Sequence, residues 1–341
     1  MRLDFFLIGV VLGLLAFGLL MVYDASVISA QRDFGDKYFY VRNQGLWVGL
    51  GLVLMTAMTF IPLKLLSTIA RPAVWISIAL LVLVFIPGIG IKTLGASRWM
   101  NLGVFRFQPS ELAKLALVLY LATWFALQKG KINIRDLSKL GATAATMAGL
   151  ILLQPDLGTA IILIGSSLLL YLVAGGPWLH FLVIVPALIL GAFGFIQIAP
   201  YRLARMTTFL HPFEDIRETG YHMYQALLAI GSGGVFGLGI GQSRQKYAFL
   251  PEATTDSIFA IIAEEVGFIG ASIVVLLFLL LLWRGFRIAF RAKDVFPRLL
   301  AAGITCMIGV QAFMNIGSMV AIIPLTGVVL PLVSYGGSSM I

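Results

Sequence analysis

Charged residues are scarce in this chain, and cysteine is almost absent. Only 11% of the 341 residues are charged, whereas soluble domains contain roughly 25%. The single cysteine, Cys306, excludes an intramolecular disulfide framework and a paired thiol ligand set. The three histidines, His180, His211 and His222, lack the spacing of metal ligands. Because 60% of the residues are hydrophobic, more than one soluble core can bury, the sequence predicts a polytopic membrane protein.

We expect residues 1–341 to form one integral membrane domain of α-helices. Nine long apolar segments predict spans near 5–23, 46–61, 73–90, 111–127, 138–153, 159–174, 178–197, 258–283 and 299–320. The first segment lacks a small-residue cleavage site and is therefore expected to be a retained span. Lys and Arg are densest in the short connections 62–72, 128–137 and 284–298, which predicts that these connections and the N-terminus face the cytoplasm. The net charge of +9 then reflects topology and not binding to nucleic acid.

Two segments do not fit a simple series of spans. Residues 198–257 form a long extracytoplasmic loop, and its GSGGVFGLGIG run at 231–241 is typical of a functional loop. Residues 321–341 contain Pro324 and Pro331, so we expect a broken, re-entrant segment there. Since another apolar run could begin at Ile341, we expect the chain to be truncated before a last span.

Three carboxylates lie at the start of the eighth predicted span. Asp256 stands where the long loop enters the helix, and Glu264 and Glu265 lie about two turns further on. A charge at the centre of a membrane helix costs about 2.5–3.5 kcal/mol or more, so such residues usually have a function. Asp256 could instead be a helix N-cap, and the two glutamates could instead bond to neighbouring helices.

A second polar cluster surrounds the start of the fourth span. Arg98 and Arg106 precede it, Ser110 is a possible N-cap, and Glu111 and Lys114 share one helix face and can pair. Alternatively, the arginines anchor the interface and the pair merely neutralises itself. Elsewhere three polar residues predict structural roles, with Asp156 as a turn or cap residue and Gln311 and Asn315 as contacts between helices.

One carboxylate, several cations and an outward-facing site in lipid suit the transfer of a sugar from a polyprenyl diphosphate. Diphosphate is a good leaving group, so no second carboxylic acid is needed, in contrast to glycoside hydrolysis. Cations or a divalent metal would stabilise the charge on the diphosphate. A single carboxylate would take the proton from the attacking hydroxyl.

The chain also resembles the SEDS family (shape, elongation, division and sporulation) of peptidoglycan polymerases, which includes FtsW, RodA and SpoVE. Its motifs occur in order along the chain as MVYDAS (21–26), GASRW (95–99), FQPSELAK (107–114), QPDLGTA (154–160), GYHMYQALLAIGSGG (220–234), GLGIGQSRQKYAFLPEATTDSIFAIIAEEVG (237–267) and NIGSMVAIIPLTGVVLPLVSYGGSS (315–339). The segments FGDKYFYVRNQ (34–44) and GQSRQK are closer to the division-type FtsW branch than to the elongation-type RodA branch.

This resemblance implies an all-α bundle of ten spans with both termini in the cytoplasm, about nine of them in this chain. It implies that Asp256 is the catalytic aspartate. It further implies that the substrate-binding residues are Arg98, Arg106, Glu111, Lys114 and Gln225. The sequence departs from the family pattern at three positions, with Ser257 in place of an aromatic residue, and Ala226 and Asp24 each in place of serine.

The resemblance implies a multi-pass enzyme of the bacterial inner membrane that polymerises lipid II into glycan strands during division, with inversion. The alternatives are an elongation-type RodA polymerase and a lipid II flippase. Mg²⁺ or Mn²⁺ is a possible cofactor. The expected partners are lipid II, the lipid-linked nascent glycan, other divisome proteins and a class B penicillin-binding protein, because the chain has no transpeptidase motif.

Small residues of the eighth and ninth spans could form the docking face for such a partner's single span. Alternatively, these residues only pack within the bundle. They are Gly267, Gly270 and Ala271 in the eighth span and Ala301, Ala302, Gly303 and Gly309 in the ninth.

Overall fold

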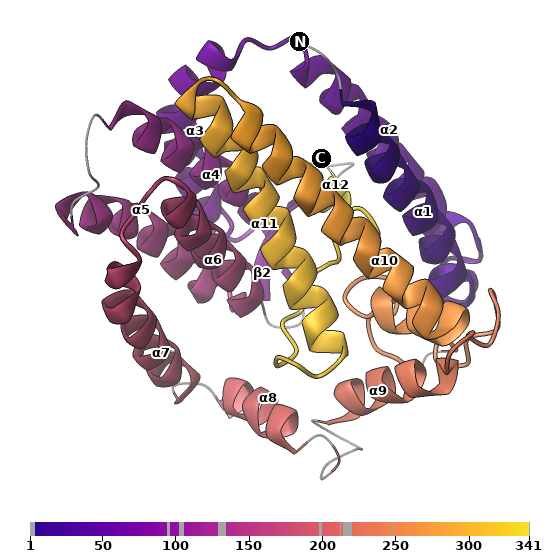
Figure 1. Ribbon diagram of the computed structural model, residues 1–341. Coiled ribbons are helices and arrows are strands. Elements are labelled where there is room, and N and C mark those ends of the chain that lie inside the picture. Colours follow the sequence, from indigo (N-terminus) through magenta and orange to yellow (C-terminus); the bar gives the residue numbers. More distant parts are fainter. Residues whose placement is uncertain are drawn as a thin grey trace. The chain divides into compact units, whose positions relative to one another are not determined.

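The computed structural model describes residues 4–93, 96–101, 106–128, 134–197, 200–211, 213, 220–247 and 249–340. The described chain is mostly helical, which confirms the predicted fold class (Figure 1). Each of the nine predicted ranges overlaps a helix. These helices are α1 (Phe5–Phe34), α2 (Phe39–Met58), α3 (Leu63–Leu83), α4 (Pro109–Leu127), α5 (Ile134–Leu153), α6 (Leu157–Val173), α7 (Phe181–Gln197), α10 (Ile258–Arg291) and α11 (Val295–Met319).

Five of these helices, α1, α3, α4, α10 and α11, are long and apolar enough to cross a membrane. Several predicted features lie outside the described residues: Gly95 of the GASRW motif, part of the cationic connection at 129–133, and Ile341.

Two helices differ clearly from the predicted ranges. α1 continues eleven residues past Tyr23, to Phe34, so the polar residues after the apolar run belong to the same helix. It ends where Gly35 adopts a left-handed conformation (φ 69°) and its N–H bonds the Gln31 carbonyl. α3 begins at Leu63, ten residues before the predicted start, and contains Pro72 within the helix. Apolar runs therefore indicated where the helices lie but not where they end.

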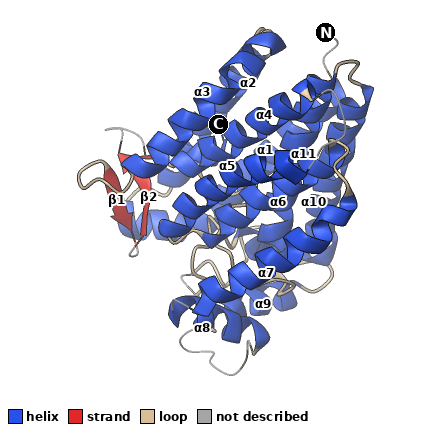
Figure 2. Ribbon diagram, turned by 90° about the vertical axis from the view of Figure 1, so that its left-hand side faces the viewer, coloured by secondary structure: helices blue, strands red, loops and turns tan. Residues whose placement is uncertain are grey.

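The long connections contain secondary structure that the sequence did not predict. Between α3 and α4 lies an antiparallel sheet in the order β1–β2–β3, formed by Gly90–Thr93, Ala96–Asn101 and Arg106–Phe107 (Figure 2). The segment 198–257 contains the helices α8 (Pro200–Leu210) and α9 (Tyr221–Gly233). The short helices η1 (Trp178–His180) and α12 (Gly337–Met340) complete the elements.

The chain forms two compact units. The first comprises Met1–Leu46, Trp178–Leu279 and Ala312–Gly336, and the second comprises Trp47–Pro177, Leu280–Gln311 and Gly337–Ile341. In the second unit α3 packs on α4, and α6 packs on both α4 and α5. In the first unit Gly18 of α1 lies so close to the backbone of Leu332 and Val333 that a side chain there would clash. Each unit thus has its own packed interior.

Three of the small residues that were proposed as a docking face for a partner lie against other parts of this protein: Gly267, Gly303 and Gly309. An added Cβ on Gly303 would lie 2.6 Å from Val118 Cγ1 of α4, and one on Gly309 would lie 3.1 Å from Leu282 of α10. Gly267 meets the backbone of Gly237. These contacts support the alternative interpretation, in which the small residues allow close packing within the bundle.

All of residues 320–336 are described, and they form neither helix nor strand. The positions of Pro324 and Pro331 account for this, because proline cannot donate the hydrogen bonds of a regular helix. We call residues 320–336 the C-terminal segment. It belongs to the first unit and contributes to the site described next.

Candidate active site

Asp256 lies at the end of a turn-rich segment, residues 251–257, that leads into α10. We call this segment the base loop. Three consecutive backbone carbonyl groups of this loop accept hydrogen bonds from residues nearer the C-terminus. The Thr254 carbonyl accepts from the Tyr335 amide (2.9 Å), the Thr255 carbonyl from Ser334 Oγ (2.6 Å) and the Asp256 carbonyl from Asn315 Nδ2 (2.8 Å). We call Asn315, Ser334 and Tyr335 the clamp.

The orientation of Asn315 is fixed by two hydrogen bonds. Its Nδ2 donates both to the Asp256 carbonyl and to the Val328 carbonyl (2.7 Å). A carbonyl oxygen could not take that place, so the amide cannot be turned over. The residue is fully buried. Its Oδ1 finds no hydrogen-bond partner among the described residues. The prediction that Asn315 connects helices is wrong, because its side chain binds Asp256 in the base loop and Val328 in the C-terminal segment, and neither residue is helical.

Gln44 of α2 holds the clamp in turn. Its Nε2 donates to the Ser334 carbonyl (3.0 Å), and its Oε1 accepts from the Gly336 amide (3.2 Å). The side chain is fully buried. Because Gln44 uses both ends of its amide on one turn of the C-terminal segment, it fixes the residues that bind the base loop.

The Asp256 carboxylate lies beside Gly327 of the C-terminal segment. An ideal Cβ on Gly327 would be 3.5 Å from Asp256 Oδ2, and this glycine has a left-handed φ of 69°. Any other residue there would be strained and would crowd the carboxylate. Asp256 is half-buried. α10 begins at Ile258, so the residue directly before the helix is Ser257 and not Asp256. The alternative reading of Asp256 as the helix cap is thus weakened.

His222 of α9 contacts the residue after Asp256. Its Nε2 lies 2.7 Å from Ser257 Oγ, and that hydroxyl donates its proton to the Pro251 carbonyl. His222 Nε2 must therefore be the donor, which makes its Nδ1 an unprotonated acceptor. Burial, with a further contribution from the positive charge of Arg205, lowers the pKa of His222 to about 4. His222 is thus neutral at physiological pH.

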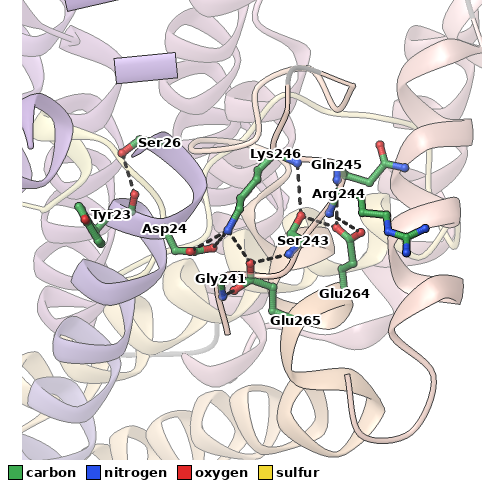
Figure 3. A network of polar contacts seen from close by, with 10 residues as sticks. All are labelled: Tyr23, Asp24, Ser26, Gly241, Ser243, Arg244, Gln245, Lys246, Glu264 and Glu265. Atoms are coloured by element: carbon green, nitrogen blue, oxygen red, sulfur yellow. Dashed lines mark hydrogen bonds and ion pairs between the residues drawn. The ribbon is translucent and has the colours of Figure 1, made fainter. Parts of the chain in front are cut away.

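The two glutamates of α10 are engaged by the loop that precedes the base loop (Figure 3). Glu265 accepts from the Gly241 and Ser243 amides and pairs with Lys246, whose Nζ lies 3.1 Å from Oε1. Lys246 also pairs with Asp24 of α1, at 2.8 and 3.0 Å. Glu264 accepts from Ser243 Oγ and from the amides of Arg244 and Gln245. The expectation that these glutamates bond to neighbouring helices is wrong for these contacts, because the donors lie in the loop at 241–246, and Lys246 of that loop extends the network to Asp24 of α1.

α10 is broken at Gly267, which has φ 68° and ψ −170°. The break frees backbone groups on both sides, and the glycine-rich segment 234–239 satisfies them. An added Cβ on Gly237 would overlap the Glu265 carbonyl oxygen, so only glycine permits this approach. Leu238 N bonds Glu264 O, Gly239 N bonds Glu265 O, Phe268 N bonds Gly234 O and Ile269 N bonds Val235 O, at 2.9 to 3.2 Å. The half-helix 258–266 that follows Asp256 is therefore held at both ends.

The other predicted cations lie in the second unit. Lys114 is buried and pairs with Glu111 (2.9 Å), as predicted, and with Gln311 of α11 (2.6 Å). Arg98 donates to the carbonyls of Gln154 (3.1 Å) and Pro155. Arg106 is exposed. Lys114 is thus a neutralised cation, and Arg98 supports a turn.

The structure decides the predicted roles of Asp156 and Ser110 and gives the location of Gln225. Asp156 caps α6, as predicted, because its Oδ1 accepts from the Thr159 amide (3.0 Å). The prediction that Ser110 caps α4 is wrong: Pro109 is already the first helical residue, and Gln108 is the N-cap. Gln225 lies on α9 in the first unit, and its Oε1 is buried without a hydrogen-bond partner among the described residues.

Sequence reasoning missed the roles of Asp24, Arg205, His222 and Lys246. Asp24 was noticed only as a departure from the family pattern. Its partner Lys246 is 222 positions away, so no local spacing could reveal the pair. The spacing of the histidines was considered only for metal binding, although a buried histidine can fix a loop without binding metal.

Comparison with known proteins gives consistent results. Residues 5–341 match the FtsW/RodA/SpoVE family, described as cell cycle proteins. The chain is 40% identical to stage V sporulation protein E of Bacillus subtilis, covering 99% of this chain and 93% of that one. It is 38% identical to a probable peptidoglycan glycosyltransferase FtsW of Geobacter metallireducens, covering 100% and 91%.

Solved structures share the fold as well as the sequence. The crystal structure of the rod shape determining protein RodA of Thermus thermophilus has a TM-score of 0.72 at 31% identity and covers 99% of this chain and 92% of that one. A chain from a structural study of polymerization and crosslinking by a peptidoglycan synthase complex has a TM-score of 0.81 at 31% identity, with 99% and 94% covered.

Proposed function

Because the chain belongs to the FtsW/RodA/SpoVE family of cell cycle proteins, we propose that it is a peptidoglycan glycosyltransferase that polymerises lipid II. Relatives at 37–39% identity bear the name probable peptidoglycan glycosyltransferase FtsW. The observation that carries the proposal is the arrangement around Asp256. Three backbone hydrogen bonds fix its loop, and the carboxylate faces the glycine of the C-terminal segment.

In the proposed reaction Asp256 is the general base. Its carboxylate removes the proton from the sugar hydroxyl of an incoming lipid II, and the hydroxyl oxygen attacks the anomeric carbon of the lipid-linked glycan. The bond from that carbon to the diphosphate breaks, and its electron pair leaves with the diphosphate. Attack from the face opposite the leaving group inverts the anomeric centre. Asp256 ends the step protonated.

The remaining predicted site residues keep supporting roles in this proposal. Arg98, Arg106 and Gln225 stay the predicted substrate contacts, although Arg98 also holds the turn at Gln154 and Pro155. Glu111 orients Lys114. No group of three or more metal-binding side chains occurs in the described part of the chain. A magnesium or manganese ion would therefore have to be bound mainly through diphosphate oxygens, as Mg²⁺ often is.

The biological role that we propose is septal wall synthesis in cell division, in the inner membrane and with the N-terminus in the cytoplasm. The FtsW relatives support division. The 40% identity to stage V sporulation protein E supports a second candidate, the same activity in sporulation. Loss of septa on depletion of the protein during growth would support the first role, and a defect confined to sporulating cells would support the second.

We further propose that a class B penicillin-binding protein is the partner, within a larger divisome assembly. A related chain was solved in a study of a peptidoglycan synthase complex that coordinates polymerization and crosslinking. Our chain contains no transpeptidase motif, so crosslinking of its product requires another protein. Co-purification of the two proteins from membranes tests this proposal.

The central experiment is polymerisation of purified lipid II by the protein and its Asp256→Asn variant, each alone and with a transpeptidase. Loss of a general base lowers the rate by about 10²–10⁴-fold. The variant is nearly isosteric and keeps the three backbone hydrogen bonds of the base loop, so it should stay folded, which its unfolding midpoint checks. Glu111→Gln should lower the rate less, because Glu111 acts only through Lys114.

Three results would contradict the proposal. Near-normal turnover by Asp256→Asn would exclude this residue as the base, and a larger loss in Glu111→Gln would point to Glu111 instead. Translocation of lipid II across vesicle membranes without any polymer would favour the flippase alternative.

A further inference from the structure

Arg205 is an exposed cation on α8, in the same unit as Asp256. Its Nη1 donates to the Leu325 carbonyl of the C-terminal segment at 3.3 Å. A guanidinium has five N–H donors in a planar fork. The bond to Leu325 therefore orients the group and leaves other donors available to a ligand.

Two independent connections place Arg205 close to the base loop. Leu325 is two residues from Gly327, which adjoins the Asp256 carboxylate. Adding the bonds and contacts along this path puts the guanidinium no more than about 15 Å from that carboxylate. The second connection runs through His222, because Arg205 contributes to lowering its pKa and His222 contacts Ser257.

Thr326 stands between the residue that binds Arg205 and the residue that adjoins Asp256. It is 9% exposed, and its Oγ1 finds no hydrogen-bond partner in the described part of the chain. A buried hydroxyl without a partner is destabilising. Such a group usually has a water, ion or ligand as its partner. The hydroxyl and the guanidinium are both suited to an anion.

We propose that Arg205, assisted by Thr326, binds the diphosphate of the polyprenyl-linked sugar. This inference rests on the proposed function and names the group in the first unit that holds the leaving diphosphate. In an in-line displacement the base and the leaving group lie on opposite sides of the transferred carbon. A cation near Asp256 but not touching it fits that geometry. Arginine binds phosphate oxygens through two parallel N–H bonds. A diphosphate ester offers a second phosphate group and more negative charge than a monophosphate ester, so a cation at this place favours the diphosphate.

A simpler interpretation is that Arg205 only attaches α8 to the C-terminal segment. The two interpretations differ in what they predict for ligand binding. If Arg205 is only an attachment, its loss weakens all lipid ligands equally or none. If Arg205 binds diphosphate, its loss reduces the preference for diphosphate over monophosphate specifically.

The test measures this preference in the Asp256→Asn protein, so that no turnover interferes. The probes are an undecaprenyl diphosphate and the matching monophosphate in detergent micelles, and the measured quantity is the ratio of their dissociation constants. Arg205→Gln should reduce the ratio at least tenfold, since a charged hydrogen bond of about 1.5–3 kcal/mol corresponds to about 10–150-fold. Thr326→Val should reduce it by a smaller factor, and Arg205→Lys should give an intermediate value.

Arg42→Gln is the matched control, because Arg42 is another exposed arginine of the first unit and pairs with Asp36. It should leave the ratio unchanged. An unchanged ratio in folded Arg205→Gln, or an equal loss in Arg42→Gln, would overturn the proposal. If Arg205→Gln does not fold, a wild-type ratio in Arg205→Lys and Thr326→Val has the same meaning. This binding result is independent of whether Asp256 is the base, which the polymerisation assay decides.

Discussion

The buried pair of Lys246 and Asp24 allows a quantitative test of how the base loop is supported. Lys246 donates three hydrogen bonds, two to Asp24 and one to Glu265, and all three side chains are largely buried (Figure 3). We consider three variants: Lys246→Met, Asp24→Ser, which restores the residue usual in the family, and the double variant. Lys246→Met leaves two carboxylates facing each other without their cation.

The expected magnitudes follow from these contacts. Removing one partner of a buried ion pair costs about 3–5 kcal/mol, so Lys246→Met should destabilise the protein by that amount. Asp24→Ser should cost about 1.5–3 kcal/mol, because Lys246 keeps its bond to Glu265. The double variant leaves Glu265 with its two backbone amides and no unpaired lysine. Its cost should therefore be smaller than the sum of the single costs by about 1–3 kcal/mol.

The assay is unfolding in mixed detergent micelles titrated with SDS and followed by tryptophan fluorescence. Burial disfavours the charged form of Lys246, but its hydrogen bonds to Asp24 and Glu265 outweigh this and raise its pKa above 10.5. A raised lysine pKa means that the stabilisation is fully present below pH 10.5 and is lost only above it. The cost of Lys246→Met should thus be equal at pH 7 and pH 9. Additive costs in the double variant would refute the pairing.

Two further predictions concern the surroundings of Asp256. Asn315→Leu removes both hydrogen bonds of its amide and should lower kcat at least about tenfold while KM changes by less than about twofold, because it displaces Asp256 and not the substrate. The control Ser318→Ala removes a buried hydroxyl one turn away that bonds only its own helix, and it should leave kcat unchanged. A wild-type kcat in Asn315→Leu would contradict the role of the clamp. His222 has a pKa of about 4 against an ordinary 6.5, so the unfolded chain binds the proton first and stability should fall by about 3 kcal/mol as the pH is lowered from 6.5 to 4. His222→Gln should flatten that part of a plot of unfolding free energy against pH, and an unchanged slope would show that another group is responsible.

Much of the fold could be predicted because long apolar runs have few alternatives in a membrane. The nine helices lie where hydropathy placed them, and the pairing of Glu111 with Lys114 followed from helical spacing. The ends of the helices could not be predicted in this way. Asp24 looks like a residue at which a span ends, yet α1 continues past it. Lys246, far along the chain, neutralises the Asp24 carboxylate within the helix.

The sequence singled out Asp256, but it did not indicate the residues that hold its loop. The position of Asp256 before an apolar helix marked it, since a carboxylate there is unusual. Asn315, Ser334 and Arg205 act through backbone carbonyls, and any sequence supplies a carbonyl at every residue. Nothing in the residue types of the base loop therefore indicates which distant side chains bind it.

The break in α10 has a consequence for the order in which the molecule is made. During synthesis residues 234–239 leave the ribosome before the break at Gly267, so the backbone partners of the half-helix 258–266 are already present when it emerges. The residues that hold the base loop, Asn315, Ser334 and Tyr335, are translated roughly 50–80 residues later, which takes several seconds at about 5–20 residues per second. The half-helix can thus enter the membrane early, whereas Asp256 reaches its final position only after the C-terminal segment has arrived. A ribosome stalled before Asn315 should hold an inserted protein whose base loop is not yet held in place.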